Sequence, residues 1–370
     1  MFVDGYMKTE LGSLTSIKTG KLDANASSEN GIYPFFTCAV EPLKIDSYSY
    51  DCECVLVAGN GDLNVKYYNG KFDAYQRTYI IESKDKSKLT VPYLYYFLES
   101  YIETLRSQSI GGIIKYIKIG NLTNASIPIL SIEKQNKIVK TLDKAKSIIT
   151  HLRIQLEKLD LLVKARFVEM FGDVINNTKR WKIYLFSEIT ISRLGKMLDK
   201  KSQTGKSKLP YLANFNVQWF QFKLDNLNMM DFNEKEQIEF SLEDDDLLVC
   251  EGGEIGRCAI WHNEITPCYF QKALHRVRCN KSIIIPIYLA WWFKFNCDNN
   301  GFSEIEGAKA TIAHLPGAKL KKLPIAVPPL TLQNQFADFV KQVDKSKSIL
   351  QQELDKAQML FDSLMQEYFG

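Results

Sequence analysis

Two long stretches of the chain place apolar residues at the spacing of an amphipathic helix. Between residues 133 and 171 no glycine or proline interrupts the chain, and apolar positions from Ile138 to Val163 alternate at intervals of four and three residues. The stretch from Val343 to Tyr368 repeats this alternation, broken only at Lys347. Such a heptad seam predicts two long helices that pack against each other, because neither can bury its seam alone. Packing of each helix on its own neighbouring domain is the alternative.

The two stretches belong to an internal repeat. Residues 143–148 (DKAKSI) recur as residues 344–349 (DKSKSI). The blocks outside the helices match more weakly but in the same order, and residues 55–62 (VLVAGNGD) correspond to residues 247–254 (LLVCEGGE). The chain therefore contains two copies of one plan, each a variable block followed by a long helix.

Alternating apolar runs between glycine and asparagine turns predict short strands in the variable blocks, and residues 93–105 and 287–295 are predicted to form short helices. We expect an α+β fold with two mixed α/β domains, separated by a long antiparallel two-helix coiled coil and related by a pseudo-two-fold internal repeat. The expected segments are the first domain at 1–127, the first long helix at 128–173, the second domain at 174–325 and the second long helix at 326–370.

Composition and charge narrow the class of protein. Hydrophobic residues make up 45% and charged residues 24% of the chain, as in folded globular proteins, and the net charge of +4 is too small to indicate a nucleic-acid binder by itself. The first residues do not form a secretory signal, and the longest apolar stretch, from Ile283 to Phe293, is too short to span a bilayer. We expect a soluble cytoplasmic protein without a membrane partner, whose eight cysteines are reduced.

A search for catalytic motifs favours a protein without an active site. The sequence contains neither a phosphate-binding loop nor a dinucleotide fingerprint, and the closest string to a methylase signature is residues 327–330 (VPPL). The acidic run Asp244–Asp246 could suggest a metal-dependent nuclease, but a solvated turn before a strand is the preferred interpretation. The cysteine and histidine spacings do not fit a zinc site, so we expect no metal.

A proline and a glutamine lead into a long amphipathic helix that closes with residues 166–173 (RFVEMFGD), and this pattern occurs twice. This order of motifs resembles the specificity subunit of type I restriction–modification systems. Residues 54–61 and 70–77 are similar to the body of the target-recognition domains of that family, and so are residues 246–254. The start of the second helix departs from the pattern, because residues 331–335 read TLQNQ without a Glu-Gln pair.

The resemblance implies a function. Each α/β domain would read one half of a bipartite, asymmetric site in double-stranded DNA, and the coiled coil would set the spacing and dock two methylase subunits. Restriction/translocase subunits would join that core. The subunit would be non-catalytic and would hold no cofactor, since S-adenosylmethionine belongs to the methylase subunits and ATP and magnesium to the restriction subunits. A decoy scaffold that occupies methylase subunits without reading DNA is the alternative.

Candidate DNA-binding residues are polar side chains on turns, which can read base edges, and lysines and arginines, which can hold phosphates. Residues 179–208 carry nine basic and two acidic side chains, and a solvated loop is the alternative there. Glycine hairpins carry Lys115 and Lys309. The candidates in the first block are Asn60, Asp62, Lys66, Lys71, Tyr75, Gln76, Arg77 and Lys115, with Arg106 and Lys118 as further cations. Those in the second block are Lys200, Lys201, Lys206, Lys208, Asn214, Gln218, Trp219, Glu254, Arg257 and Lys309. For each candidate, the alternative to DNA binding is an ordinary structural role in a turn or in the core.

Overall fold

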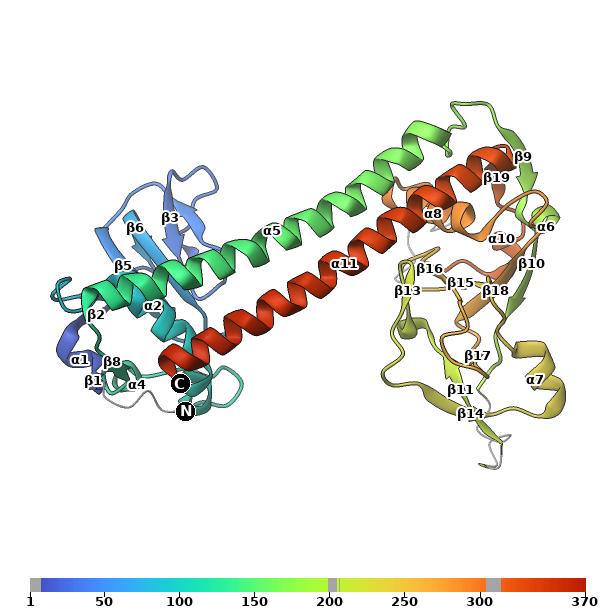
Figure 1. Cartoon of the computed structure of the whole chain (residues 1–370). Coiled ribbons are helices and arrows are strands. Elements are labelled where there is room, and N and C mark those ends of the chain that lie inside the picture. The colour runs from blue at the N-terminus through green and yellow to red at the C-terminus, as the bar shows by residue number, and fades with distance from the viewer. Residues whose placement is uncertain (1–7, 199–204, 206, 304–313) are drawn as a thin grey trace. The chain divides into compact units, whose positions relative to one another are not determined.

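The computed structural model describes residues 8–198, 205, 207–303 and 314–370, and the chain divides into two compact units (Figure 1). The first unit comprises Met1–Gln155 and Leu350–Gly370, and the second comprises Leu156–Ile349. Two helices, α5 (Ile132–Phe171) and α11 (Leu330–Phe369), each contribute one part to each unit. Helices α5 and α11 lie within the segments 128–173 and 326–370 that were predicted to form the long helices. No helix in the described part of the chain is long and apolar enough to cross a membrane.

The first unit is built on a six-stranded sheet in the order β2-β7-β5-β6-β3-β4, antiparallel except where β3 pairs with β6. A two-stranded sheet joins β1 to β8. The strands are β1 (Lys8–Glu10), β2 (Thr15–Thr19), β3 (Tyr33–Phe36), β4 (Leu43–Ile45), β5 (Tyr50–Ala58), β6 (Val65–Ala74), β7 (Thr78–Ser83) and β8 (Ser126–Pro128). The short helices are α1 (Leu11–Leu14), α2 (Val91–Ser100), α3 (Ile102–Gln108) and α4 (Ile119–Thr123), so the single helix predicted at 93–105 is two helices that meet at Tyr101.

The second unit contains a four-stranded sheet in the order β10-β18-β15-β16, a three-stranded sheet in the order β14-β11-β17, and two strand pairs, β12-β13 and β19-β9. The strands are β9 (Lys182–Leu185), β10 (Thr190–Leu194), β11 (Lys208–Leu212), β12 (Val217–Gln218), β13 (Gln221–Phe222), β14 (Asn228–Asp231), β15 (Leu247–Cys250), β16 (Cys258–Ile260), β17 (Tyr269–Phe270), β18 (Leu274–Cys279) and β19 (Pro324–Val327). The short helices are α6 (Phe186–Ile189), α7 (Glu234–Phe240), α8 (Pro286–Asp298) and α10 (Gly317–Leu320).

Strand alternation explains the cores of both units. In β5, Val55 and Val57 face a core that includes α2, while Cys54 and Leu56 face a separate cluster on the other side of the sheet. The same division occurs along β15, where successive residues belong alternately to two cores. Successive side chains of a strand point to opposite faces, so an apolar run of this kind is buried on both sides.

The start of each long helix is fixed by one buried glutamine. The side chain of Gln135 accepts a hydrogen bond from the Thr90 amide at 2.9 Å and donates to the carbonyls of Lys88 and Leu130 at 2.7 and 2.9 Å. Gln333 repeats this arrangement in the second unit. It accepts from the amide of Ile285 at 3.0 Å and donates to the carbonyls of Ile283 and Pro328 at 2.9 and 2.8 Å. Both side chains are fully buried. The apparent departure at residues 331–335 is therefore no departure in structure, because Gln333 stands where Gln135 does.

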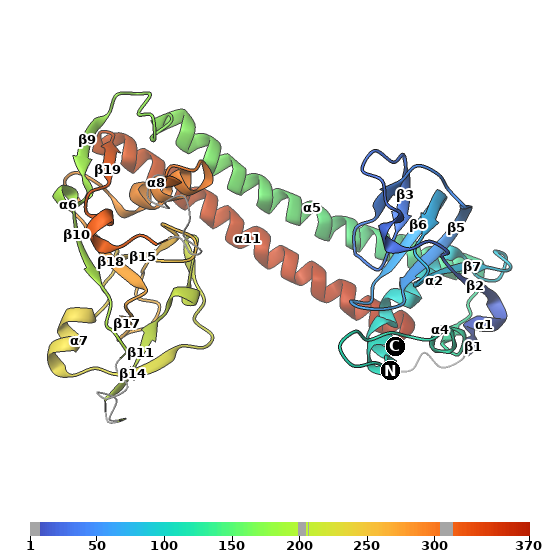
Figure 2. The same ribbon diagram turned by 180° about the vertical axis from the view of Figure 1, so that it is seen from behind.

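Within each unit the halves of α5 and α11 lie side by side, as both views show (Figures 1 and 2). In the first unit, Ile138 and Leu142 share a core with Met365 and Phe369. In the second unit, Val163 shares a core with Phe336, Val340 and Val343 of α11. Lys347, the break in the predicted seam, pairs with Asp160 at 2.6 Å. Helices α5 and α11 thus contribute apolar side chains to one common core inside each unit.

Candidate nucleic-acid interface

Three loops of the first unit are joined by backbone hydrogen bonds, and we call them the first junction: residues 59–64, 75–77 and 109–117. The amide of Gly59 donates to the Arg77 carbonyl at 2.8 Å, and the Gly59 carbonyl accepts from the Ile117 amide at 2.9 Å. The amide of Gly61 donates to the Lys115 carbonyl at 2.9 Å. A Cβ on Gly59 would lie 2.4 Å from the Arg77 carbonyl oxygen, so this approach requires glycine. Candidates that are distant in sequence therefore lie on adjacent loops.

The predicted residues of the first junction present their polar groups at the surface. Asp62 is exposed and pairs with Arg106 at 3.0 Å, and Arg106 also donates to the Leu63 carbonyl. Arg77 and Lys115 are exposed, while Asn60 is half-buried and forms a bridge with Tyr116. Among residues that the structure describes, Arg77 and Lys115 have no ion pair, so both charges are available to a ligand.

The remaining first-unit candidates make other contacts. Gln76 is exposed and donates to Asp23 at 2.9 Å, whereas Tyr75 is half-buried and bridges to Leu22. The ammonium of Lys66 contacts the Asn64 side chain, and burial lowers the pKa of Lys66. Lys71 belongs to a different surface, because its ammonium lies 4.7 Å from the centre of the Tyr48 ring. Its contact with the Tyr48 hydroxyl raises the pKa of Lys71.

The second unit contains a junction of the same plan, formed by residues 251–257, 271–273 and 314–315. The amide of Glu251 donates to the Ala273 carbonyl at 3.0 Å, and its carbonyl accepts from the Leu315 amide at 2.6 Å. Gly252 and His314 form an antiparallel bridge, as Asn60 and Tyr116 do in the first junction. The strand registers agree, since Val57 pairs with Tyr79 in one unit and Val249 with His275 in the other.

The predicted residues of the second junction make hydrogen bonds within the protein. Arg257 donates to the side-chain oxygen of Asn214 at 2.6 Å and to its carbonyl at 3.1 Å, and Asn214 in turn donates to the Gly252 carbonyl at 2.9 Å. The Trp219 indole donates to Glu254 at 2.8 Å. Gln218 donates to the Phe215 carbonyl at 2.9 Å. The structure therefore brings Asn214, Trp219, Glu254 and Arg257 together around a single glycine-containing loop.

One side chain closes each junction from the neighbouring strand. In the first unit, the Tyr79 hydroxyl donates to the Ile117 carbonyl at 3.0 Å. In the second, Nε2 of the buried His275 donates to the Leu315 carbonyl at 3.1 Å, which requires the Nε2-protonated tautomer because a carbonyl can only accept. Burial raises the pKa of Tyr79 and lowers the pKa of His275. Both groups are therefore neutral in the folded protein at neutral pH.

The basic stretch at 179–208 is partly structural. Lys196 is buried, with its ammonium 2.6 Å from Glu236 and 2.6 Å from the Asp231 carbonyl. The amides of Gly205 and Ser207 donate to the Asp231 carboxylate at 2.6 and 3.1 Å, so Asp231 holds the backbone at these two residues. Lys208 is exposed on β11. The candidates Lys200, Lys201, Lys206 and Lys309 lie outside the described residues.

A turn in the second unit was not among the predicted DNA-binding segments. Gln271 and Lys272 occupy the place that Tyr75 and Gln76 hold in the first, since the amides of Tyr75 and Gln271 donate to the equivalent carbonyls of Phe36 and Leu212 at 2.9 and 3.1 Å. Lys272 is exposed. In the sequence, Gln271 and Lys272 directly follow two aromatic residues, as Tyr75 and Gln76 follow β6. The residues of the two turns differ, so the sequences alone do not show that the turns are equivalent.

The acidic run and the cysteines have structural roles. Asp246 is buried and accepts from Arg278 at 2.7 and 3.2 Å, and Asp245 pairs with Lys281 at 2.5 Å. Asp244 and Asp245 lie near His262, but exposed acidic groups at a turn are common without a metal. All eight cysteines are free, and burial raises the pKa of Cys250 to about 11, so it remains a thiol.

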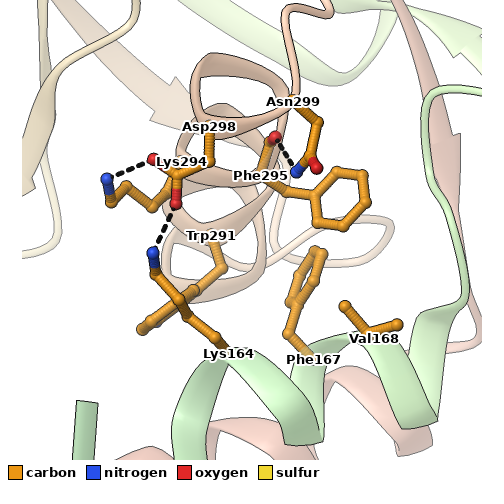
Figure 3. A pocket seen from close by; sticks show the side chains of 8 residues that line it. All are labelled: Lys164, Phe167, Val168, Trp291, Lys294, Phe295, Asp298 and Asn299. Carbon is orange, nitrogen blue, oxygen red and sulfur yellow. Dashed lines mark hydrogen bonds and ion pairs between the residues drawn. The ribbon is translucent and has the colours of Figure 1, made fainter. Parts of the chain in front are cut away.

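A pocket of about 240 Å³ lies between α5 and α8 in the second unit (Figure 3). The rings of Phe167, Trp291 and Phe295 form its apolar wall. Asp298 at its rim binds Lys164 at 2.7 Å and Lys294 at 2.6 Å. Next to it, α5 exposes Leu161, Ala165 and Val168 at helical spacing, so an apolar stripe continues from the pocket along the helix surface.

The chain has an α+β fold of two units, and one plan of backbone hydrogen bonds joins loops in both. The chain belongs to the family of the type I restriction modification DNA specificity domain, which matches residues 4–158 and 178–359. The chain is 37% identical over 179 residues to the type I restriction enzyme EcoDI specificity subunit of Escherichia coli, and the match covers 48% of this chain and 40% of that protein. It is 22% identical over 309 residues to a Haemophilus influenzae protein named as a type I restriction enzyme specificity subunit, covering 80% of this chain and 76% of the other.

Two solved structures share the fold over nearly the whole chain. The crystal structure of a type I restriction–modification S subunit from M. genitalium superposes with a TM-score of 0.63 at 18% identity, covering 100% of this chain and 97% of that one. A chain from a structural study of complex assembly and conformational transition of the type I system superposes with a TM-score of 0.62 at 13% identity, covering 99% and 98%. Both likenesses therefore establish the two-unit α+β fold.

Proposed function

We propose that this chain is the non-catalytic DNA-recognition subunit of a type I restriction–modification system in the cytoplasm, and that it reads a bipartite, asymmetric site in double-stranded DNA. The observation that carries the proposal is the recurrence of one hydrogen-bonded loop junction in both units of a chain from the DNA specificity family. Each junction reads one half of the site. Residues 1–127 and 174–325 act as target-recognition domains, and α5 and α11 act as the antiparallel coiled coil between them.

The side chains of the two junctions support an asymmetric site. Asn60 and Asp62 in the first junction correspond to Gly252 and Glu254 in the second. An asparagine can hydrogen-bond an adenine edge at two points and glycine cannot, while the carboxylates of Asp62 and Glu254 differ in length. Two junctions with different donors and acceptors on one backbone plan will prefer different half-sites.

Exposed cations near the junctions supply affinity. Arg77 and Lys115 in the first unit, and Lys208 and Lys272 in the second, are exposed side chains that can hold phosphates. Phosphate contacts position a protein on the duplex and release counterions, so binding will weaken steeply as salt concentration rises. Lys196 makes no such contribution, because it is buried against Glu236.

The stripe on α5 and the adjoining pocket fit a partner helix. Leu161 and Val168 are 63% and 46% exposed, and with Ala165 they form an apolar face that a methylase subunit would bury. In the proposal one of two methylase subunits docks in this way, and restriction/translocase subunits join the core. Methyl transfer uses S-adenosylmethionine on the methylase subunits, and cleavage uses ATP and magnesium on the restriction subunits.

The test is single-molecule sequencing of adenine methylation in a methylation-free host that expresses this chain together with its methylase subunit. The expected result is one split motif with a modified adenine in each half. A matched strain that carries the methylase without this chain should show no motif. A stable complex with the methylase that methylates no site would contradict the proposal and indicate a decoy scaffold.

A further inference from the structure

The hairpin of the first junction ends in exposed isoleucines. Its strands pair at Ile110 and Tyr116 through two backbone hydrogen bonds of 3.0 and 2.8 Å. Gly111 has a φ of +119°, and a Cβ there would lie 2.6 Å from the Ile114 carbonyl oxygen, so only glycine permits this turn. Within the turn, Ile113 is 103% exposed and Ile114 is 62% exposed. Two large aliphatic side chains therefore project from a tight turn into solvent.

The foot of this hairpin is fixed, although its tip is exposed. The Lys115 carbonyl accepts from Gly61, the Ile117 amide donates to Gly59, and the Tyr79 hydroxyl donates to the Ile117 carbonyl. These bonds hold the hairpin beside Asn60 and Asp62, the two side chains proposed to read bases. The isoleucines are thus presented at a constant position relative to the reading loop.

The charge around the tip indicates what covers it. Residues 109–121 carry Lys115 and Lys118 and no acidic side chain, whereas Arg106 at the foot of the hairpin is already paired with Asp62 and Glu103. An apolar tip between cations complements an anionic partner with an apolar interior. The DNA duplex has this character, because phosphates line both sides of a stack of apolar base faces.

We propose that Ile113 and Ile114 form a wedge that enters between adjacent base pairs of the first half-site, while Lys115 and Lys118 hold the flanking phosphates. The inference rests on the proposed function and deepens it. Aliphatic wedges of this kind unstack one base step and bend the duplex. A methylase must extrude its target adenine, and a base step that is already opened nearby lowers the cost of extrusion. The wedge would therefore assist methylation of the first half-site.

The experiment uses the full chain assembled with its methylase subunits. The DNA is an unmodified duplex that carries the motif identified by methylation sequencing. Bending is measured by energy transfer between dyes at the duplex ends. Unstacking is measured by the fluorescence of 2-aminopurine, placed in turn at positions of the first half-site other than the target adenine. The double variant I113S/I114S removes the apolar tip at two exposed positions, and I113L/I114L preserves it. The variant I119S is the matched control, because Ile119 is 48% exposed in the same segment but lies on α4.

The native complex should bend the duplex and raise 2-aminopurine fluorescence at one step. I113S/I114S should lose both signals and bind about tenfold more weakly with an unchanged salt dependence, while I113L/I114L and I119S should match the native complex. Unchanged bending and fluorescence in I113S/I114S would overturn the wedge. Failure of this variant to assemble with the methylase in mass photometry would also overturn it, since the tip would then be a protein-docking surface. A native complex that binds no motif would instead refute the proposed function itself.

Discussion

The two junctions share a backbone plan but differ in how their side chains close it. Tyr79 closes the first junction, and the side chain of Asp62 there is 80% exposed. The second is closed by His275, and its loop is tied down by Arg257, whose side chain is only 17% exposed. Backbone hydrogen bonds therefore fix where a junction lies, whereas its side chains are free to diverge. The proposed reading of two half-sites of different sequence requires this combination.

The largest expected effect tests whether the two units are equivalent. Gln135→Ala and Gln333→Ala each remove three hydrogen bonds from a fully buried side chain, so each should destabilise its own unit by about 3 kcal/mol. Hydrogen exchange followed by mass spectrometry can report on α2 and α8 separately. Gln351→Ala on the exposed surface of α11 is the control. Unequal losses at the two glutamines would break the equivalence.

A second comparison tests the difference in how the loops are held. Arg257→Ala leaves the Asn214 acceptors without their donor and should destabilise the second junction by about 2 kcal/mol. Arg106→Ala removes an exposed pair and should cost less than about 1 kcal/mol. Methylation sequencing should then find a relaxed motif in one half of the site for Arg257→Ala only. Equal relaxation in both halves would show that the second loop is not individually supported.

The smallest expected effect at neutral pH concerns the closing side chains. Burial lowers the pKa of His275 below its ordinary 6.5, so the unfolded second unit binds a proton more readily than the folded one. The stability that His275 contributes is complete above about pH 6.5 and is lost as the pH falls through its folded-state pKa. Tyr79 does not titrate in this range.

Hydrogen exchange near Leu315, compared with exchange near Ile117 at the same pH, measures this difference. Between pH 7.5 and 5.5 protection should fall more in the second junction than in the first. His275→Gln keeps a side-chain amide donor but does not titrate, so it should remove the excess loss. An excess that persists in His275→Gln would assign the acid sensitivity to another group.

Much of the fold could be predicted because its signals are local. The heptad spacing predicted α5 and α11, and alternating apolar runs predicted β5 and β15. The family resemblance followed from the same ordered motifs, and the family match agrees with it. Periodicity needs only neighbouring residues, so one sequence was enough.

Other features depend on partners far along the chain and could not be predicted. The glutamine at the start of each long helix belonged to the predicted pattern, but its role did not, because Gln333 binds a carbonyl on a loop about fifty residues earlier. Lys196 was counted among surface cations, but Glu236 on α7 makes it a buried ion pair. The candidate DNA-binding residues remain predictions, and the structure adds which of them lie together.

The division of the long helices between the units has a consequence for synthesis on the ribosome. The first unit contains residues 1–155 but is completed only by residues 350–370, whose Met365 and Phe369 enter its core. The second unit, although encoded later, emerges whole before those residues do. The domain that is translated first is therefore the last to be able to finish folding. Until then Tyr93 and Phe97 lack their contact with Phe369, whose ring centre lies 5.1 and 6.1 Å from theirs in the folded protein.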